Sequence, residues 1–138
     1  MSDCLFCDIV AGAAPASVVR ETDRVLAFLD IRPVAPGHTI VVPKAHADGL
    51  GDLAPDDAAA MMKVATYVAE ACREAAAVDA EGINLFLADG AVAGQEVFHA
   101  HLHVVPRFAD DDVGFRWRRR SPGRAELDAI AEALAERV

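Results

Sequence analysis

The chain lacks any hydrophobic run long enough to cross a membrane. Hydrophobic residues make up 54% of its 138 residues, but they occur in runs shorter than the roughly 18 residues that a membrane-spanning helix needs. Residues 1–4 also lack the basic start and the continuous apolar stretch of a secretory signal peptide. We therefore expect a cytoplasmic protein with no membrane partner.

Cysteine is scarce, and positive charge is not in excess. Three cysteines, an odd number, fit a reducing compartment better than a disulfide framework. The formal net charge of −9 opposes sequence-independent binding of DNA or RNA, which depends on neutralising phosphates, so we expect no nucleic-acid partner. A local cluster of arginines surrounds Trp117 and either forms a solvated surface or receives a phosphate or a partner's carboxylates: Arg116, Arg118, Arg119, Arg120 and Arg124.

The length suits one domain spanning residues 1–138, because a chain of this size can bury a core of its own. Apolar spacing predicts strands over residues 17–21, 24–30, 37–43, 83–88 and 97–107, and helices over 5–10, 55–78 and 124–138. Strands grouped around one long helix favour an α+β fold with a mostly antiparallel five-stranded sheet. We expect the last helix to turn an apolar face inward, made of Leu127, Ile130, Ala131 and Leu134.

Histidine alternates with apolar residues in the stretch 97–107, and this is the most informative pattern in the chain. A period of two is typical of a β-strand with one buried and one open face. We expect the apolar set to enter the core and the histidines to line the opposite face: Phe98, Ala100, Leu102 and Val104 on one side, His99, His101 and His103 on the other.

A row of imidazoles after a glycine-containing loop is typical of phosphoryl or nucleotidyl transfer. A neutral imidazole can attack phosphorus near pH 7, because its unperturbed pKa is about 6.5. Flanking imidazoles and backbone amides can stabilise the phosphoryl oxygens. His101, in the middle of the row, is best placed to be the nucleophile, while His99 and His103 can orient it or hold the phosphate.

The sequence resembles the histidine triad (HIT) family of nucleotide hydrolases and transferases. Residues 99–105 match the family motif of three alternating histidines followed by two apolar residues, and residues 28–33 and 35–38 resemble its nucleoside pocket and upstream histidine. The resemblance implies that His101 attacks the α-phosphorus of a nucleoside phosphoramidate, an acyl-nucleotide or a dinucleoside polyphosphate. Water then resolves the nucleotidyl-histidine and releases a nucleoside monophosphate.

The resemblance also implies roles for neighbouring residues. The backbone carbonyl of His99 orients the nucleophile, His103 and His38 complete the phosphate environment, and Asp30 binds the ribose hydroxyls. Apolar side chains wall the purine base, although ordinary core packing is the alternative for them: Leu5, Phe6, Ile9, Phe28 and Ile31. The loop that faces the phosphates comprises Gly94, Gln95, Glu96 and Val97.

Glu96 departs from the family pattern, because relatives often carry Ser or Thr at this position. A carboxylate beside a phosphate repels it unless the carboxylate is protonated, turned away or paired with arginine. This difference bears on the leaving group more than on the chemical step.

Two cysteines with the spacing of a zinc site lie near the start of the chain. Cys4 and Cys7 either pack as free thiols or bind metal. Some bacterial members of the family combine such cysteines with a histidine after Pro-Lys, here His46, and with the first triad histidine, His99. The resemblance therefore implies a structural Zn²⁺ held by these four residues.

Two other functions compete with the nucleotidyl-transfer enzyme. One is a nucleotide-binding regulator with little turnover, and the other is a metal-dependent hydrolase that uses the histidines as ligands. The resemblance further implies a homodimer. The choice between adenine and guanine stays open.

Overall fold

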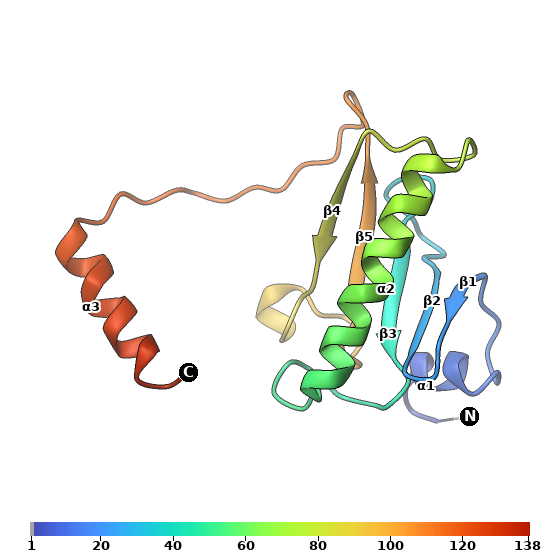
Figure 1. Cartoon of the computed structure of the whole chain (residues 1–138), viewed down its shortest axis with the longest axis horizontal. Helices are drawn as coiled ribbons and strands as arrows, with labels where there is room; N and C mark the ends of the chain where they lie inside the picture. The colour runs from blue at the N-terminus through green and yellow to red at the C-terminus, as the bar shows by residue number, and fades with distance from the viewer. Residues whose placement is uncertain (1) are drawn as a thin grey trace.

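The computed structural model describes residues 2–138 (Figure 1). Within these residues, five strands form one sheet in the order β1-β2-β3-β5-β4, with every neighbouring pair antiparallel. This confirms the predicted α+β fold. The strands are β1 (Val18–Glu21), β2 (Val25–Leu29), β3 (Thr39–Pro43), β4 (Gly82–Phe86) and β5 (Leu102–Arg107).

The two faces of the sheet are covered by different helices. The long helix α2 (Pro55–Glu74) lies across one face and packs its buried side chains, such as Met61 and Val64, against Val41 and Val104 (Figure 1). The short helix α1 (Leu5–Val10) covers the other face, where Phe6 packs with Phe28, Ile40 and Val42. Alternate residues of one strand therefore belong to different cores, as the period of two requires.

Helix α2 begins where the sequence predicted and ends earlier. Pro55 suits the first helical turn because its missing N–H has no intrahelical partner there, and two aspartates follow it at the positive end of the helix dipole. The helix stops at Glu74 instead of continuing to residue 78. A turn follows, in which the Ala80 N–H donates to the Cys72 carbonyl at 2.9 Å.

The predicted histidine strand is wrong in its first half. Strand β5 begins at Leu102, and Phe98, expected in the core, is 50% exposed. His99, expected on the open face, is fully buried. The physical reason is that this segment pairs with the loop after β3: the Ala100 N–H donates to the Ala47 carbonyl at 2.7 Å. From Leu102 onward the alternation holds, with Leu102 against the α2 core and His103 on the opposite face.

The last part of the chain leaves the body of the fold. An extended segment follows β5 and leads to α3 (Arg124–Ala135), which stands apart from the sheet (Figure 1). Its predicted inward-facing side chains are exposed, because no element of the described chain lies against them: Leu127, Ile130, Ala131 and Leu134. Within residues 2–138, every helix is too short or too polar to cross a membrane.

Candidate active site

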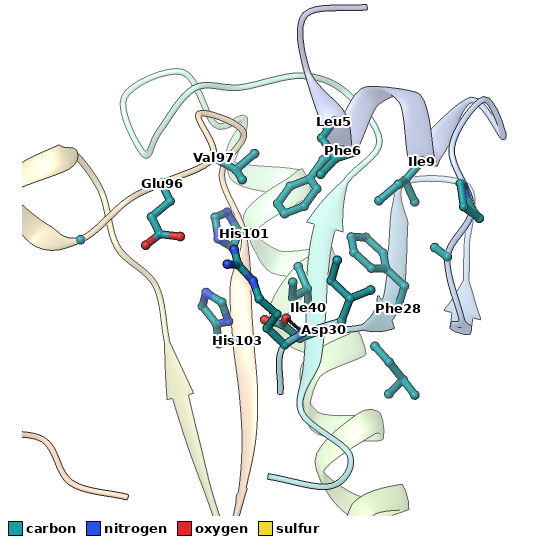
Figure 2. A pocket seen from close by; sticks show the side chains of 16 residues that line it. Leu5, Phe6, Ile9, Phe28, Asp30, Ile40, Glu96, Val97, His101 and His103 are labelled. Carbon is teal, nitrogen blue, oxygen red and sulfur yellow. Dashed lines mark hydrogen bonds between the residues drawn. The ribbon is translucent and has the colours of Figure 1, made fainter. Parts of the chain in front are cut away.

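A cavity of about 390 Å³ opens on the α1 face of the sheet (Figure 2). This volume falls within the range of sites for small molecules. The cavity collects residues from α1, the end of β2, the loop before β5, and the histidine segment. The lining residues are Leu5, Phe6, Ile9, Pro15, Ala16, Phe28, Leu29, Asp30, Ile31, Arg32, Ile40, Gly94, Glu96, Val97, His101 and His103.

One wall of the cavity is apolar. Phe6 and Phe28 meet edge to face with ring centroids 5.5 Å apart, and both are almost fully buried. They belong to the core on this face and line the cavity at the same time, so core packing does not exclude a place on the cavity wall. Leu5 and Ile31 lie at the mouth and are exposed. The wall offers an apolar, aromatic surface of the kind that holds an aromatic base.

His101 presents an unprotonated nitrogen to the cavity. Its Nδ1 lies 2.7 Å from the carbonyl oxygen of His99. A carbonyl only accepts, so Nδ1 carries a proton and donates it, which in the neutral ring leaves the lone pair on Nε2. The ring also meets the edge of Phe6 at a centroid distance of 5.0 Å. Since His101 is 7% exposed and lines the cavity, its orientation is fixed while its free nitrogen stays accessible.

His103 presents a hydrogen-bond donor to the same cavity. The Val34 N–H donates to His38 Nδ1 at 3.2 Å, so the proton of a neutral His38 is on Nε2. His38 Nε2 lies 2.8 Å from His103 Nδ1 and donates to it, which places the proton of His103 on its own Nε2. Burial, and then the neighbouring imidazoles of His101 and His38, lower the pKa of His103 to about 4. The ring is therefore neutral at physiological pH.

Asp30 stands at the end of β2 and lines the cavity beside His38. Its main chain is held by a bond from its N–H to the His38 carbonyl at 2.9 Å. One carboxylate oxygen accepts the Arg32 N–H at 2.8 Å, and the other lies 3.6 Å from His38 Nε2. The carboxylate is thus held in place and still faces the cavity, where it can accept hydrogen bonds from hydroxyl groups.

The loop before β5 is braced by Gln95. This side chain is 5% exposed and does not line the cavity. Its Oε1 accepts the Gly90 N–H at 2.8 Å, and its Nε2 donates to the carbonyls of Asp48 at 2.6 Å and Val97 at 3.1 Å. Gly94 adopts φ 96°, a left-handed conformation that favours glycine. Any nucleotide contact from Gln95 would have to come from its main chain.

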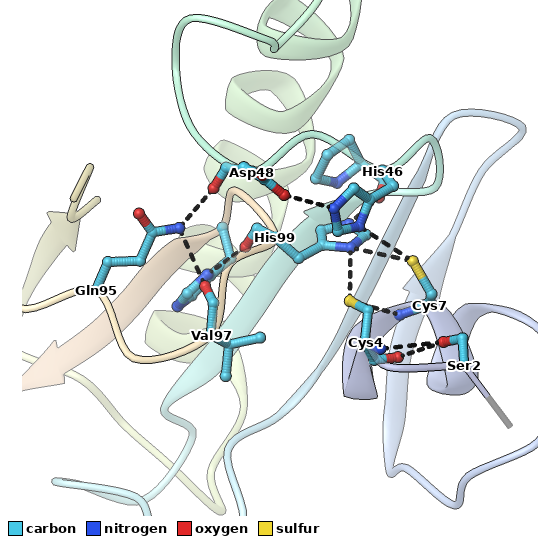
Figure 3. Close-up of polar contacts among 10 residues, drawn as sticks. Ser2, Cys4, Cys7, His46, Asp48, Gln95, Val97 and His99 are labelled. Carbon is cyan, nitrogen blue, oxygen red and sulfur yellow. Dashed lines mark hydrogen bonds and ion pairs between the residues drawn. The ribbon is translucent and has the colours of Figure 1, made fainter. Parts of the chain in front are cut away.

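Four predicted metal ligands converge beside the cavity (Figure 3). One donor atom from each of Cys4, Cys7, His46 and His99 lies within 4.8 Å of all the others. His99 Nδ1 lies 3.4 Å from Cys4 Sγ and 3.5 Å from Cys7 Sγ, and His46 Nδ1 lies 3.3 Å from Cys7 Sγ. Ligands around a tetrahedral zinc, with bonds of about 2.0–2.3 Å, are about 3.3–3.8 Å apart. The four donors therefore fit zinc.

Hydrogen bonds turn the two histidines toward this centre. His99 Nε2 donates to the Pro43 carbonyl at 2.7 Å, and His46 Nε2 donates to Asp48 Oδ1 at 2.7 Å. Both rings then offer an unprotonated Nδ1 to the metal, which is the outer-shell arrangement usual for zinc ligands. Burial is the largest cause of the lowered pKa of His99, which keeps this ring neutral. Burial also raises the pKa of Cys7 to about 11, so its proton must be displaced when a metal binds.

Five lining residues had no role in the sequence prediction: Pro15, Ala16, Leu29, Arg32 and Ile40. Ile40 shares the α1 face of β3 with Val42 and could have been found from strand alternation. Arg32 lies within the stretch that resembles the nucleoside pocket, yet its residue type alone did not suggest a contact. His38 and His99 do not line the cavity and act on it through His103 and His101.

Comparisons with known proteins agree with this geometry. The family model described as HIT domain matches residues 11–110. A crystal structure of a HIT family protein from Bacillus anthracis is 37% identical, covers 99% of this chain and 98% of that chain, and superposes with a TM-score of 0.93. A zinc-bound histidine triad family protein from Mycobacterium smegmatis is 43% identical, with 97% and 96% covered and a TM-score of 0.78. The adenylylsulfatase HINT3 of Arabidopsis thaliana is 35% identical over 96% of this chain and 64% of its own length.

Proposed function

The chain belongs to the HIT family of nucleotide-binding hydrolases and transferases, and we propose that it cleaves nucleoside phosphoramidates, acyl-nucleotides or dinucleoside polyphosphates at the α-phosphorus. The observation that carries the proposal is the bond from His101 Nδ1–H to the His99 carbonyl, which leaves Nε2 free to attack within the cavity. The Arabidopsis relative is an adenylylsulfatase, which supports cleavage at the α-phosphorus of an adenylyl group.

The proposed reaction has two displacements. In the first, the Nε2 lone pair of His101 forms a bond to the α-phosphorus, and the bond to the leaving group breaks with its electron pair. An amine leaving group takes up a proton from water. In the second, a water oxygen attacks the same phosphorus, the phosphorus–nitrogen bond to His101 breaks, and a nucleoside monophosphate and a proton are released. The Nε2–H of His103 donates to a phosphoryl oxygen throughout.

The nucleoside would bind on the apolar side of the imidazoles. Asp30 accepts hydrogen bonds from the ribose hydroxyls, and a purine base lies along Phe6, Phe28 and Ile9. A cavity with one apolar wall and a few placed polar groups supports this assignment. We propose no preference between adenine and guanine, because the wall described here is apolar and offers neither base a distinguishing hydrogen bond.

We also propose that Cys4, Cys7, His46 and His99 hold a structural Zn²⁺. The ion would cross-link α1 to the segment that carries His99. The His99 carbonyl receives the proton of His101 Nδ1, so a fixed His99 keeps the nucleophile in the correct tautomer and orientation. The role of the metal in this account is to hold the fold around the site.

The hydrogen bonds disfavour a catalytic metal between Asp30, His38 and His103. Asp30, His38 and His103 offer donor atoms close enough together for an ion. However, the Val34 N–H points at His38 Nδ1 and keeps the proton on Nε2, so His38 has no lone pair facing that ion.

A nucleotide-binding regulator shares the pocket of the proposed enzyme, and turnover alone separates these two functions.

A homodimer is part of the proposal. Strand β4 lies at the edge of the sheet with Leu85 and Phe86 exposed, and Phe86 stacks on Phe115 of the departing segment at 5.9 Å. The agreement with the Bacillus anthracis crystal structure spans 99% of this chain, including the part that carries α3. An isolated chain gains no burial from holding α3 away from its body. A second copy that covers these apolar surfaces explains their exposure, and sedimentation should give twice the chain mass.

The experiment is a substrate panel tested with the intact protein and with His101→Ala. The panel contains adenosine and guanosine phosphoramidates, acyl-nucleotides and dinucleoside polyphosphates. We expect a nucleoside monophosphate as product and a loss of at least a thousandfold with His101→Ala, as for removal of other catalytic nucleophiles. Binding of the monophosphate should persist in the variant, because Asp30 and the apolar wall remain. Equal turnover by the two proteins would refute the nucleophile, and monophosphate binding without turnover would favour the regulator.

A further inference from the structure

Glu96 occupies the cavity on the side opposite the base wall. Figure 2 shows its carboxylate to one side of His101 and His103, with Phe6, Phe28 and Asp30 on the other side. The side chain comes from the loop that Gln95 braces, so its point of attachment is held firmly. Glu96 also lines a second hollow, next to Cys4 and Cys7. It is therefore a wall residue at the junction of the phosphate site and open solvent.

The negative charge of Glu96 is not balanced locally. Within residues 2–138, its carboxylate takes part in no ion pair and accepts no hydrogen bond. The cation that lines the cavity, Arg32, comes from the connection after β2, next to Asp30. An α-phosphate in the site brings further negative charge toward Glu96. Like charges repel, so the carboxylate of Glu96 disfavours substrates that bring more negative charge close to it.

With the nucleoside along the apolar wall, as in the proposed function, the leaving group would lie on the Glu96 side of the phosphate. The nucleoside is placed along the apolar wall, and His101 supplies the attacking nitrogen from within the cavity. The remaining substituent of phosphorus must then project away from the base wall, toward the loop before β5 and solvent. A cationic substituent there meets an unpaired carboxylate, whereas an anionic one meets repulsion.

We propose that Glu96 determines specificity for the leaving group and selects nucleoside 5′-phosphoramidates whose amine bears a second, positively charged nitrogen. The proposal rests on the proposed function, because it concerns the same cavity and the same displacement by His101. The bond broken is the phosphorus–nitrogen bond; the amine takes the electron pair and a proton from water, and its distal ammonium stays next to Glu96. Anionic leaving groups, including polyphosphates, are the disfavoured class.

The test uses three adenosine 5′-phosphoramidates that differ in the charge at the far end of the amine. Ethylenediamine gives a cation, propylamine a neutral chain and β-alanine an anion. We expect kcat/KM to fall in this order for the intact protein. With Glu96→Gln, the ratio of the cationic to the anionic substrate should fall by on the order of tenfold, as expected for one charge pair near a surface. Glu96→Asp should retain most of the preference, and added salt should weaken it.

Glu74→Gln is the matched control, because it removes the same charge from an exposed position at the end of α2, on the other face of the sheet. For this control, the ratio of kcat/KM for the cationic substrate to that for the anionic substrate should stay within about twofold of the value for the intact protein. Turnover that depends on His101 with a ratio unchanged by Glu96→Gln would overturn this inference and leave the proposed function standing. Absence of His101-dependent turnover with all three substrates and with the acyl-nucleotides and dinucleoside polyphosphates of the panel, in adenosine or guanosine form, would overturn both.

Discussion

Replacing Gln95 by alanine should loosen the loop before β5 and thereby weaken catalysis, although the Gln95 side chain does not line the cavity. The side chain makes one hydrogen bond to the Gly90 N–H and two to the carbonyls of Asp48 and Val97, all from a position only 5% exposed. Each such bond contributes about 0.5–1.5 kcal/mol net. Fixing the glutamine side chain on folding costs up to about 2 kcal/mol of conformational entropy, and the alanine variant avoids this cost. We therefore expect Gln95→Ala to lower the free energy of unfolding by about 2 kcal/mol.

The assay is urea unfolding of the zinc-loaded protein, combined with amide hydrogen exchange of residues 90–97. The three bonds join one loop to another, so part of the loss can appear as local opening instead of global unfolding. Exchange in residues 90–97 should then rise by at least tenfold while α2 is unchanged. The value of kcat/KM should fall for every nucleotide substrate, because the loop that carries Glu96 and Val97 is less ordered.

An isosteric variant separates hydrogen bonding from loss of volume. Gln95→Glu keeps an acceptor for the Gly90 N–H but points a carboxylate at two carbonyl oxygens. It should be at least as destabilising as alanine at pH 7. Its folded-state pKa should be raised, so stability should recover as the pH falls toward about 4.3, the ordinary pKa of glutamate. The bracing role is refuted if Gln95→Ala changes unfolding by less than about 0.5 kcal/mol and leaves exchange in the loop unchanged.

Two further predictions concern the metal and the titration of the triad. Removal of Zn²⁺ with a chelator, or Cys4→Ser, should lower Tm and slow turnover in parallel with loss of structure. Immediate loss of activity in a protein whose Tm is unchanged would instead indicate a catalytic metal. Because the pKa of His103 falls from about 6.5 in the unfolded chain to about 4 in the folded protein, its contribution to stability is complete above pH 6.5 and is lost as the pH falls toward 4. After allowance for partial exposure this contribution is about 1–2 kcal/mol. The free energy of unfolding of His103→Asn, measured with urea, should therefore depend less on pH than that of the intact protein. Equal pH dependence in the two proteins would exclude a lowered pKa of His103.

The chemistry of the histidine segment could be predicted because it depends on local geometry. The bond that sets the tautomer of His101 reaches only two residues back, to the His99 carbonyl. The resemblance to the histidine triad family predicted the set of zinc ligands, and the structure brings Cys4, Cys7, His46 and His99 together. The alternation of β3 residues between the two faces of the sheet, with Val41 in one core and Ile40 and Val42 in the other, likewise follows from the strand itself.

Other features depend on contacts between distant segments and could not be read from a local pattern. His99 turns away from the cavity because Cys4 and Cys7 lie beside its Nδ1 and the Pro43 carbonyl accepts its Nε2–H. The role of Gln95 depends on Asp48, which is far away in the sequence. The outward position of α3 was missed because an amphipathic pattern shows that a face is apolar but does not identify what covers it.

In the proposed mechanism, His101 forms a covalent bond to the α-phosphorus. The most direct measurement is the stereochemical course at phosphorus, followed with a nucleoside phosphoramidothioate of known configuration hydrolysed in isotopically labelled water. Each in-line displacement inverts the configuration, so attack by His101 followed by water predicts overall retention. Overall inversion would show that water attacks directly and would contradict the account.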